Sequence, residues 1–211
     1  MRIAIPIFDG LTALDAVGPY EVLSRLPGAT VTFLAFEPGP VRTENGMLAL
    51  HADGALSDLR DPDVVVVPGG LGTRRLLDDE RLLSWLRTAH ATTTWTTSVC
   101  TGSLLLAAAG LLDDTDATTH WLEFDTLRRL GARPIEQRFV ERGKVITGAG
   151  VSAGIDMALH LAAVIAGETT ARAIQLAMEY DPQPPFDSGS PTKAGPELIE
   201  LVRSHARTLL A

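Results

Sequence analysis

Short apolar segments alternate with longer helix-favouring segments along most of this chain. Apolar and β-branched runs of strand length predict strands. They occur at residues 3–8, 30–36, 64–67, 92–98 and 117–120. Segments rich in leucine and alanine, or with apolar residues at helical spacing, predict helices. They occur at residues 11–26, 78–91, 102–112, 121–130, 153–166, 169–180 and 196–210.

The order of these segments predicts an α/β fold. The run Val64-Val65-Val66-Val67 is continuous rather than alternating, which is typical of a parallel strand buried on both faces. Residues 40–51 predict a hairpin or an irregular pair, and residues 138–140 and 144–147 predict a hairpin or a strand pair. Residues 181–194, rich in Pro, Gly and Ser, predict a loop. Strands that alternate with helices indicate a parallel sheet covered by helices on both faces. Ligands bind at the carboxyl ends of such strands, where Pro68-Gly69-Gly70, Cys100 and His120 are expected.

Composition narrows the classes of protein. A chain of 211 residues with 45% hydrophobic content can bury a full core, so we expect one domain over residues 1–211. The net charge of −8 argues against nucleic acid as a partner. One cysteine excludes an internal disulfide and fits a reducing compartment. The apolar run at residues 3–8 is too short for a signal peptide or a membrane span, so we expect a cytoplasmic protein with no membrane partner.

The single cysteine lies at a predicted strand-to-helix turn. Ser98 and Gly102, two residues to either side of Cys100, are small, as a sharp turn requires. The pattern is similar to the G-x-S-x-G nucleophile elbow, with cysteine in place of serine. A helix N-terminus favours the thiolate, so we expect Cys100 to be exposed with a lowered pKa. The alternative is a small buried hydrophobic residue, which is what most lone cysteines are.

Three other features are candidates for function: Asp15, the glycine-rich segment at residues 148–153, and the histidines. Asp15 lies among Leu14, Ala16 and Val17, where an unpaired carboxylate is costly, so we expect it to have a buried partner. Residues 148–153 match G-x-G-x-x-G/A, but their late position favours close packing over dinucleotide binding. The five histidines show no metal-ligand spacing, and we expect neither a metal nor a cofactor.

Four motifs together resemble the DJ-1/ThiJ/PfpI superfamily. They are Ser98-Val99-Cys100-Thr101-Gly102-Ser103, Ala117-Thr118-Thr119-His120-Trp121, Val67-Pro68-Gly69-Gly70, and Phe8-Asp9-Gly10 followed by Leu14-Asp15 and Gly18-Pro19. Residues 147–156 and 175–191 are most similar to the isonitrile hydratase branch. The resemblance implies a flavodoxin-like three-layer sandwich with a mostly parallel central sheet, and a homodimer that acts on a small molecule.

The same resemblance implies roles for individual residues. It assigns the nucleophile to Cys100, the acid that contacts it to Asp15, and the oxyanion hole to the backbone N–H groups of Gly70 and Thr101. His120 and Trp121 are possible lining residues of the site. For His120 we favour the alternative that it caps the short strand and forms a hydrogen bond with the backbone.

The resemblance also orders the possible activities. Thr101 stands where protease-like relatives carry histidine, so peptidase activity is not expected. The expected activity is hydration of an isonitrile to an N-substituted formamide through a thioimidate on Cys100. Two alternatives remain open: a non-catalytic sensor like the domains that precede AraC-type DNA-binding modules, and a glyoxalase-like or stress-response relative.

Overall fold

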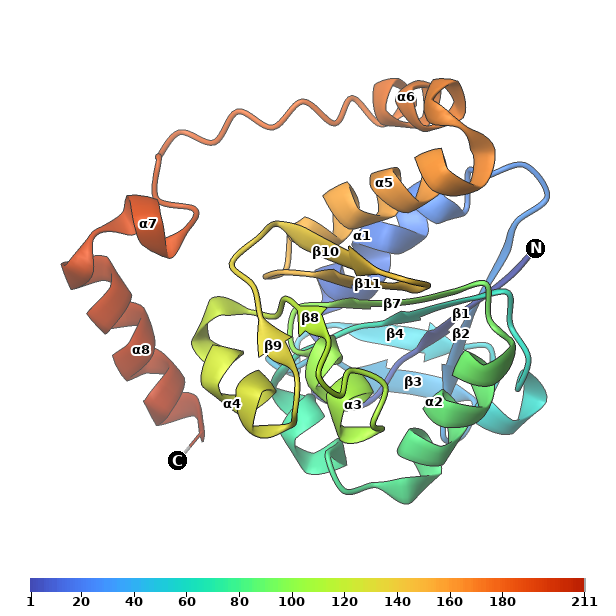
Figure 1. The fold of residues 1–211 in the computed structure, drawn as a ribbon, viewed down its shortest axis with the longest axis horizontal. Coiled ribbons are helices and arrows are strands. Elements are labelled where there is room, and N and C mark those ends of the chain that lie inside the picture. Colours follow the sequence, from blue (N-terminus) through green and yellow to red (C-terminus); the bar gives the residue numbers. More distant parts are fainter. Residues whose placement is uncertain (211) are drawn as a thin grey trace. The chain divides into compact units, whose positions relative to one another are not determined.

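The computed structural model describes residues 1–210, and side chains through residue 206. It divides into two units, Met1–Gln175 and a second unit that begins at Leu176. The first unit is built on a seven-stranded sheet in the order β10-β11-β7-β6-β1-β2-β5 (Figure 1). These strands are β1 (Arg2–Pro6), β2 (Thr30–Ala35), β5 (Gly54–Ala55), β6 (Val64–Val67), β7 (Trp95–Val99), β10 (Phe139–Arg142) and β11 (Val145–Gly148). Only the β10–β11 pair is antiparallel, so the expected mostly parallel sheet is confirmed.

Helices cover both faces of this sheet. Figure 1 shows α1 (Ala13–Leu23) and α5 (Ala153–Ala166) together on one face, and α2 (Glu80–Thr92), α3 (Gly102–Ala108) and α4 (Phe124–Arg129) on the other. The first unit also contains α6 (Glu168–Ala177, which continues two residues into the second) and three 3₁₀ helices. These are η1 (Leu56–Asp58), η2 (Leu71–Leu76) and η3 (Trp121–Glu123). The three-layer sandwich implied by the resemblance is therefore confirmed.

Several predicted boundaries change. The predicted hairpins are antiparallel pairs, β3 (Gly39–Arg42) with β4 (Ala49–Ala52) and β10 with β11. The segment predicted as a strand at residues 117–120 is only β8 (Asp116–Ala117), which pairs with β9 (Arg133–Pro134) outside the main sheet. In the second unit, the predicted loop contains α7 (Pro191–Ala194), and α8 (Pro196–Leu210) is the predicted last helix.

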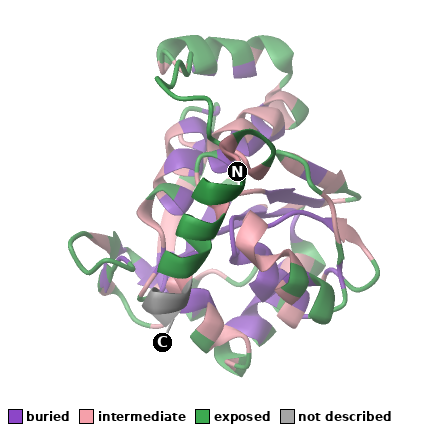
Figure 2. Cartoon of the chain, turned by 90° about the vertical axis from the view of Figure 1, so that its left-hand side faces the viewer, coloured by how far each residue is buried: buried purple, intermediate pink, exposed green. Residues whose placement is uncertain are grey.

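Burial follows the parallel strands. All four valines of β6 are buried, as are Ile3 and Ile5 of β1. Figure 2 colours the chain by burial, with buried positions in purple. Residues 176–206 include no buried position, so the core of the described chain lies in the first unit. No helix among residues 1–210 combines the length and apolar character needed to cross a bilayer.

The carboxyl ends of β6 and β7 approach each other closely because glycines lie between them. A Cβ atom on Gly102 would lie 2.1 Å from the carbonyl oxygen of Val67, and one on Gly69 would lie 2.5 Å from the backbone nitrogen of Thr101. Any larger residue would force the two chain segments apart. These glycines therefore set how closely the Cys100 turn packs on the turn after β6.

This packing yields a stability prediction. Gly102→Ala should lower the free energy of unfolding by roughly 3 kcal/mol or more, because the methyl group overlaps backbone atoms that have no room to move. The measurement is the urea midpoint, with Gly189→Ala as control, since a Cβ there meets no atom within 4 Å. An unchanged midpoint for Gly102→Ala would contradict the close approach.

Candidate functional site

Cys100 lies on a strained turn between β7 and α3. Its φ angle is 56°, in the left-handed region that residues other than glycine rarely adopt. Its N–H donates to the carbonyl oxygens of Ala149 at 2.8 Å and Gly148 at 3.1 Å. Its carbonyl accepts from the hydroxyls of Thr119 at 3.0 Å and Ser103 at 3.2 Å. Four hydrogen bonds to this one residue therefore hold the turn in its unfavourable conformation.

Asp15 provides the carboxyl group of the site. It is on the first turn of α1, wholly buried, and its Oδ2 accepts the Gly69 N–H at 2.9 Å. The Cys100 thiol interacts with the same carboxyl group, although Oδ1 has no hydrogen bond of normal geometry among the described residues. Burial raises the pKa of Asp15 to about 7, and the charge of Glu44 adds to the rise. Near neutral pH this carboxyl can therefore both accept and donate a proton.

The thiol environment differs from the sequence prediction. Cys100 is only 5% exposed, and burial followed by the charge of Asp15 raises its pKa well above the ordinary value. The backbone N–H groups of Thr101 and Val151 act in the opposite direction but do not outweigh burial. The expectation of an exposed thiol with a lowered pKa is wrong, because desolvation exceeds the effect of the helix terminus. Attack by this sulfur thus calls for a proton acceptor, and Asp15 is beside it.

The hydroxyl of Thr101 is hydrogen-bonded within the protein. Thr101 Oγ1 accepts the Gly70 N–H at 2.9 Å and lies 3.2 Å from the Gly70 carbonyl oxygen. Thr73 completes the cluster, because its hydroxyl donates to the same carbonyl at 2.8 Å. The Gly70 N–H, implied as an oxyanion donor, is therefore already hydrogen-bonded. The N–H groups that act on the sulfur are those of Thr101 and Val151.

His120 and Trp121 begin the 3₁₀ helix η3. His120 Nδ1 accepts the Leu122 N–H at 3.4 Å, so it caps this helix rather than the short strand. Its ring packs on Gly150, where a Cβ would lie 3.1 Å from Cδ2, and its centroid is 5.9 Å from that of Trp121. Burial lowers the pKa of His120. These contacts support the backbone-capping interpretation and make a neutral imidazole the form expected near pH 7.

Sequence reasoning missed Glu44 and Val151. Glu44 lies in the polar loop between β3 and β4, where an acidic residue gives no local signal of function. Its Oε1 accepts from the Thr12 hydroxyl at 2.9 Å, and its Oε2 accepts the Leu71 N–H at 3.1 Å. Val151 acts through its backbone, which no side-chain pattern reveals. Both became visible only once loops distant in sequence were placed together.

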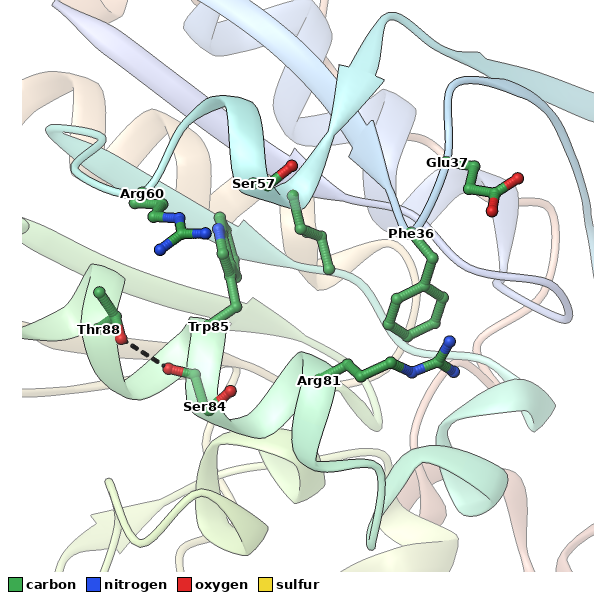
Figure 3. Close-up of a pocket in the computed structure, with 9 residues that line it drawn as sticks. Phe36, Glu37, Ser57, Arg60, Arg81, Ser84, Trp85 and Thr88 are labelled. Atoms are coloured by element: carbon green, nitrogen blue, oxygen red, sulfur yellow. Dashed lines mark hydrogen bonds between the residues drawn. The ribbon is translucent and has the colours of Figure 1, made fainter.

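A separate cavity of about 340 Å³ lies between η1 and α2 (Figure 3). Its lining residues are Phe36, Glu37, Leu56, Ser57, Arg60, Arg81, Ser84, Trp85 and Thr88, so it shares none with the Cys100 site. Arg81 stacks on Phe36 at 4.1 Å and pairs with Asp79, and the Trp85 indole donates to the carbonyl of Leu59 at 3.1 Å. Much of its polar chemistry is thus already used within the fold.

The described residues contain no cluster of three metal-ligating side chains. The groups that the structure gathers at Cys100 are one thiol, one carboxyl group and backbone N–H donors. This is a set suited to covalent acid–base catalysis.

Comparison with known proteins places the chain in a family. The DJ-1/PfpI family model matches residues 1–164. The chain belongs to the DJ-1/PfpI family. It is 43% identical over 206 residues to an isonitrile hydratase of Pseudomonas putida, covering 98% of this chain and 90% of the relative. It is 33% identical to the HTH-type transcriptional regulator CdhR of Pseudomonas aeruginosa, covering 75% of this chain and 48% of the regulator.

A solved structure agrees with the assignment. The crystal structure of a ThiJ/PfpI family protein from Pseudomonas syringae superposes with a TM-score of 0.92 at 38% identity. The superposition covers 99% of this chain and 88% of that one. The match thus covers almost the whole chain, whereas the family model ends at residue 164.

The raised pKa of Asp15 yields a prediction about stability. The folded-state value of about 7 exceeds the ordinary 3.8, so the folded protein binds more protons between these pH values. The stability contribution of Asp15 is then full below pH 4 and is lost as pH rises through 7. Asp15→Asn should gain roughly 3–4 kcal/mol relative to wild type between pH 4 and pH 8. Urea unfolding across this range measures the difference.

The control is Asp125→Asn, whose side chain is 83% exposed. Its stability relative to wild type should stay nearly constant over the same range, because water screens the exposed carboxylate. Parallel curves for wild type and Asp15→Asn would show that Asp15 titrates as a solvated carboxyl.

The Thr101 contacts predict a loss of stability in Thr101→Val. The valine removes the only recorded acceptor of the buried Gly70 N–H among the described residues, which should cost about 1–3 kcal/mol. Thr101→Ser keeps the hydroxyl and should remain within about 1 kcal/mol of wild type. Thermal unfolding distinguishes the two. A loss in Thr101→Ser with none in Thr101→Val would assign the effect to the methyl group instead.

Proposed function

We propose that this protein is a cysteine-dependent hydratase that converts isonitriles into N-substituted formamides. The supporting observation is the placement of two buried groups, Cys100 and Asp15, around Gly69. The Gly69 N–H donates to Asp15 Oδ2, Gly69 packs on the backbone of Thr101 next to the thiol, and the pKa of Asp15 lies near 7. The near full-length similarity to an isonitrile hydratase supports the substrate class.

In the first step the sulfur of Cys100 attacks the terminal carbon of R–N≡C. Asp15 accepts the thiol proton as the S–C bond forms and delivers it to that carbon, giving the thioimidate R–N=CH–S–Cys100. The N–H groups of Thr101 and Val151, which act on the sulfur, stabilise its developing negative charge. No proton enters or leaves the site in this step.

In the second step water attacks the thioimidate carbon. Asp15 now acts as base toward water and passes that proton to the nitrogen, giving R–NH–CH(OH)–S–Cys100. As the C–S bond breaks, the proton of the new hydroxyl passes through the carboxyl group to the sulfur. The products are R–NH–CHO and the Cys100 thiol, so the reaction sums to addition of one water. One carboxyl group suffices because its pKa lies near the working pH.

The alternatives predict different behaviour. A sensor is favoured by the similarity to CdhR, although the chain spans less than half of that regulator. Such a sensor would bind a small molecule without turnover. Peptidase chemistry is disfavoured by Thr101, which supplies no imidazole next to the nucleophile. The homodimer implied by the resemblance stays a prediction, which light scattering checks.

Turnover of a simple aryl isonitrile, read as formamide by chromatography, tests the proposal. Cys100→Ala should give no product, because no sulfur is present to form the thioimidate. Asp15→Asn should lower kcat by about 10²-fold or more, because it removes general acid–base catalysis. Glu21→Gln, on the same helix and paired with Arg25 in the wild type, should leave kcat unchanged.

Mass spectrometry of acid-quenched wild type should show Cys100 heavier by one molecule of isonitrile. Full turnover by Cys100→Ala would remove the covalent mechanism. Lactate from methylglyoxal with no formamide would favour the glyoxalase-like alternative instead.

A further inference from the structure

Glu44 lies where three segments of the site meet. Its backbone N–H donates to the carbonyl of Leu11 at 2.9 Å, and Thr43 forms a bridge to Leu11. Its two carboxylate oxygens accept from the Thr12 hydroxyl and from the Leu71 N–H. A surface glutamate in a loop normally leaves both oxygens to water. Here both are used by groups of the protein.

The two partners of the Glu44 carboxylate lie next to the two segments that hold Asp15, the start of α1 and the Gly69–Gly70 turn. Thr12 precedes α1 and starts the turn that carries Asp15. Leu71 follows the Gly69–Gly70 turn, whose first N–H binds the Asp15 carboxylate. The Thr12 N–H also donates to the carbonyl of Gly69 at 2.9 Å, so the two segments are joined directly as well. Glu44 therefore spans the junction from which Asp15 faces Cys100.

We propose that Glu44 is a positioning residue of the Cys100 site, which clamps the two segments around Asp15 and places a second negative charge beside the Asp15–Cys100 pair. The kinetic consequences rest on the proposed function, whereas the consequences for thiol reactivity do not. The charge raises the pKa of both Asp15 and Cys100. Glu44 thereby favours the protonated forms of both groups and raises the pH at which Asp15 becomes the carboxylate that accepts the thiol proton.

Other charged groups near the site also act on its titratable side chains. Asp15 and Cys100 act on each other, and Glu44 acts on both. Glu44, Glu123 and Arg74 act on His120, and the last two form an ion pair between η3 and η2. At the base of the Glu44 loop, Asp9 accepts the Arg42 N–H and the Arg75 guanidinium donates to the Asp9 carbonyl. The substitutions proposed below change none of these groups other than Glu44 itself.

Two variants separate the clamp from the charge. In Glu44→Gln the amide oxygen can accept the Leu71 N–H while the amide nitrogen donates to Thr12, so both contacts remain and the charge is lost. In Glu44→Ala the contacts and the charge are lost together. Glu37→Gln is the matched control, because it removes an exposed loop carboxylate that lines the separate cavity.

The first measurement is the rate of Cys100 alkylation by iodoacetamide from pH 6 to 10 at low salt. Removal of a charge that acts through water should lower the thiol pKa by roughly half a pH unit. Below the midpoint, Glu44→Gln should then react about threefold faster than wild type at equal pH. The difference should shrink in 1 M NaCl, because salt screens an exposed charge. Glu37→Gln should match wild type.

The second measurement is the pH profile of kcat/KM for the isonitrile. Its acidic limb, set by the Asp15–Cys100 pair, should move about half a pH unit lower in Glu44→Gln, with the plateau kept. Glu44→Ala should show the same shift and a lower plateau, because Asp15 is no longer held in place.

The outcomes are distinct. Profiles of Glu44→Gln that coincide with wild type would overturn the electrostatic role, and an equal shift in Glu37→Gln would assign the effect to overall charge and overturn it too. A plateau in Glu44→Ala equal to wild type would overturn the clamp. A wild type that alkylates normally but hydrates no isonitrile would overturn the proposed function alone, and the alkylation profiles would still decide the role of Glu44.

Discussion

The burial of one carboxyl group governs the rest of this site. Asp15 has lost contact with water and receives one backbone N–H in return, from Gly69. A single hydrogen bond does not replace the hydration of a carboxylate, so the proton is held until the pH approaches 7. The same desolvation acts on Cys100, which makes its thiolate costly. The thiol is the weaker acid of the two, so it ionises only when a nearby base such as Asp15 takes its proton.

The backbone is arranged to bring this pair together. The parallel strands β6 and β7 end side by side, and the glycines after β6 allow the Cys100 turn to approach within a distance that no side chain would permit. The left-handed conformation of Cys100 is held by four hydrogen bonds, which offset its strain. Thr101 closes the arrangement by bonding Gly70, so the turn after β6 and the elbow form one hydrogen-bonded unit.

Exposed charges act on the buried Asp15–Cys100 pair electrostatically, without touching the thiol. Glu44 is at the surface, yet its hydrogen bonds reach the segments on both sides of Asp15. This arrangement allows the surface loop to affect a proton that water does not reach. The charges of the Arg74–Glu123 ion pair, which joins η2 to η3, likewise act on the pKa of His120. Loops of the sheet's carboxyl edge thus set the electrostatics of the core beneath them.

The sequence by itself determined the α/β class, the parallel sheet and the turn that carries Cys100. These follow from local signals: the valine run of β6, the alternation of strands with helices, and small residues around one cysteine. The apolar neighbours of Asp15 also predicted its burial. Only the tertiary structure decided the direction of the Cys100 pKa shift and the hydrogen bond between the Gly70 N–H and Thr101. It alone also brought the Val151 N–H and the Glu44 carboxylate to the site. Each of these depends on desolvation or on contacts between segments far apart in the chain, and no local pattern of residues encodes the distance between them.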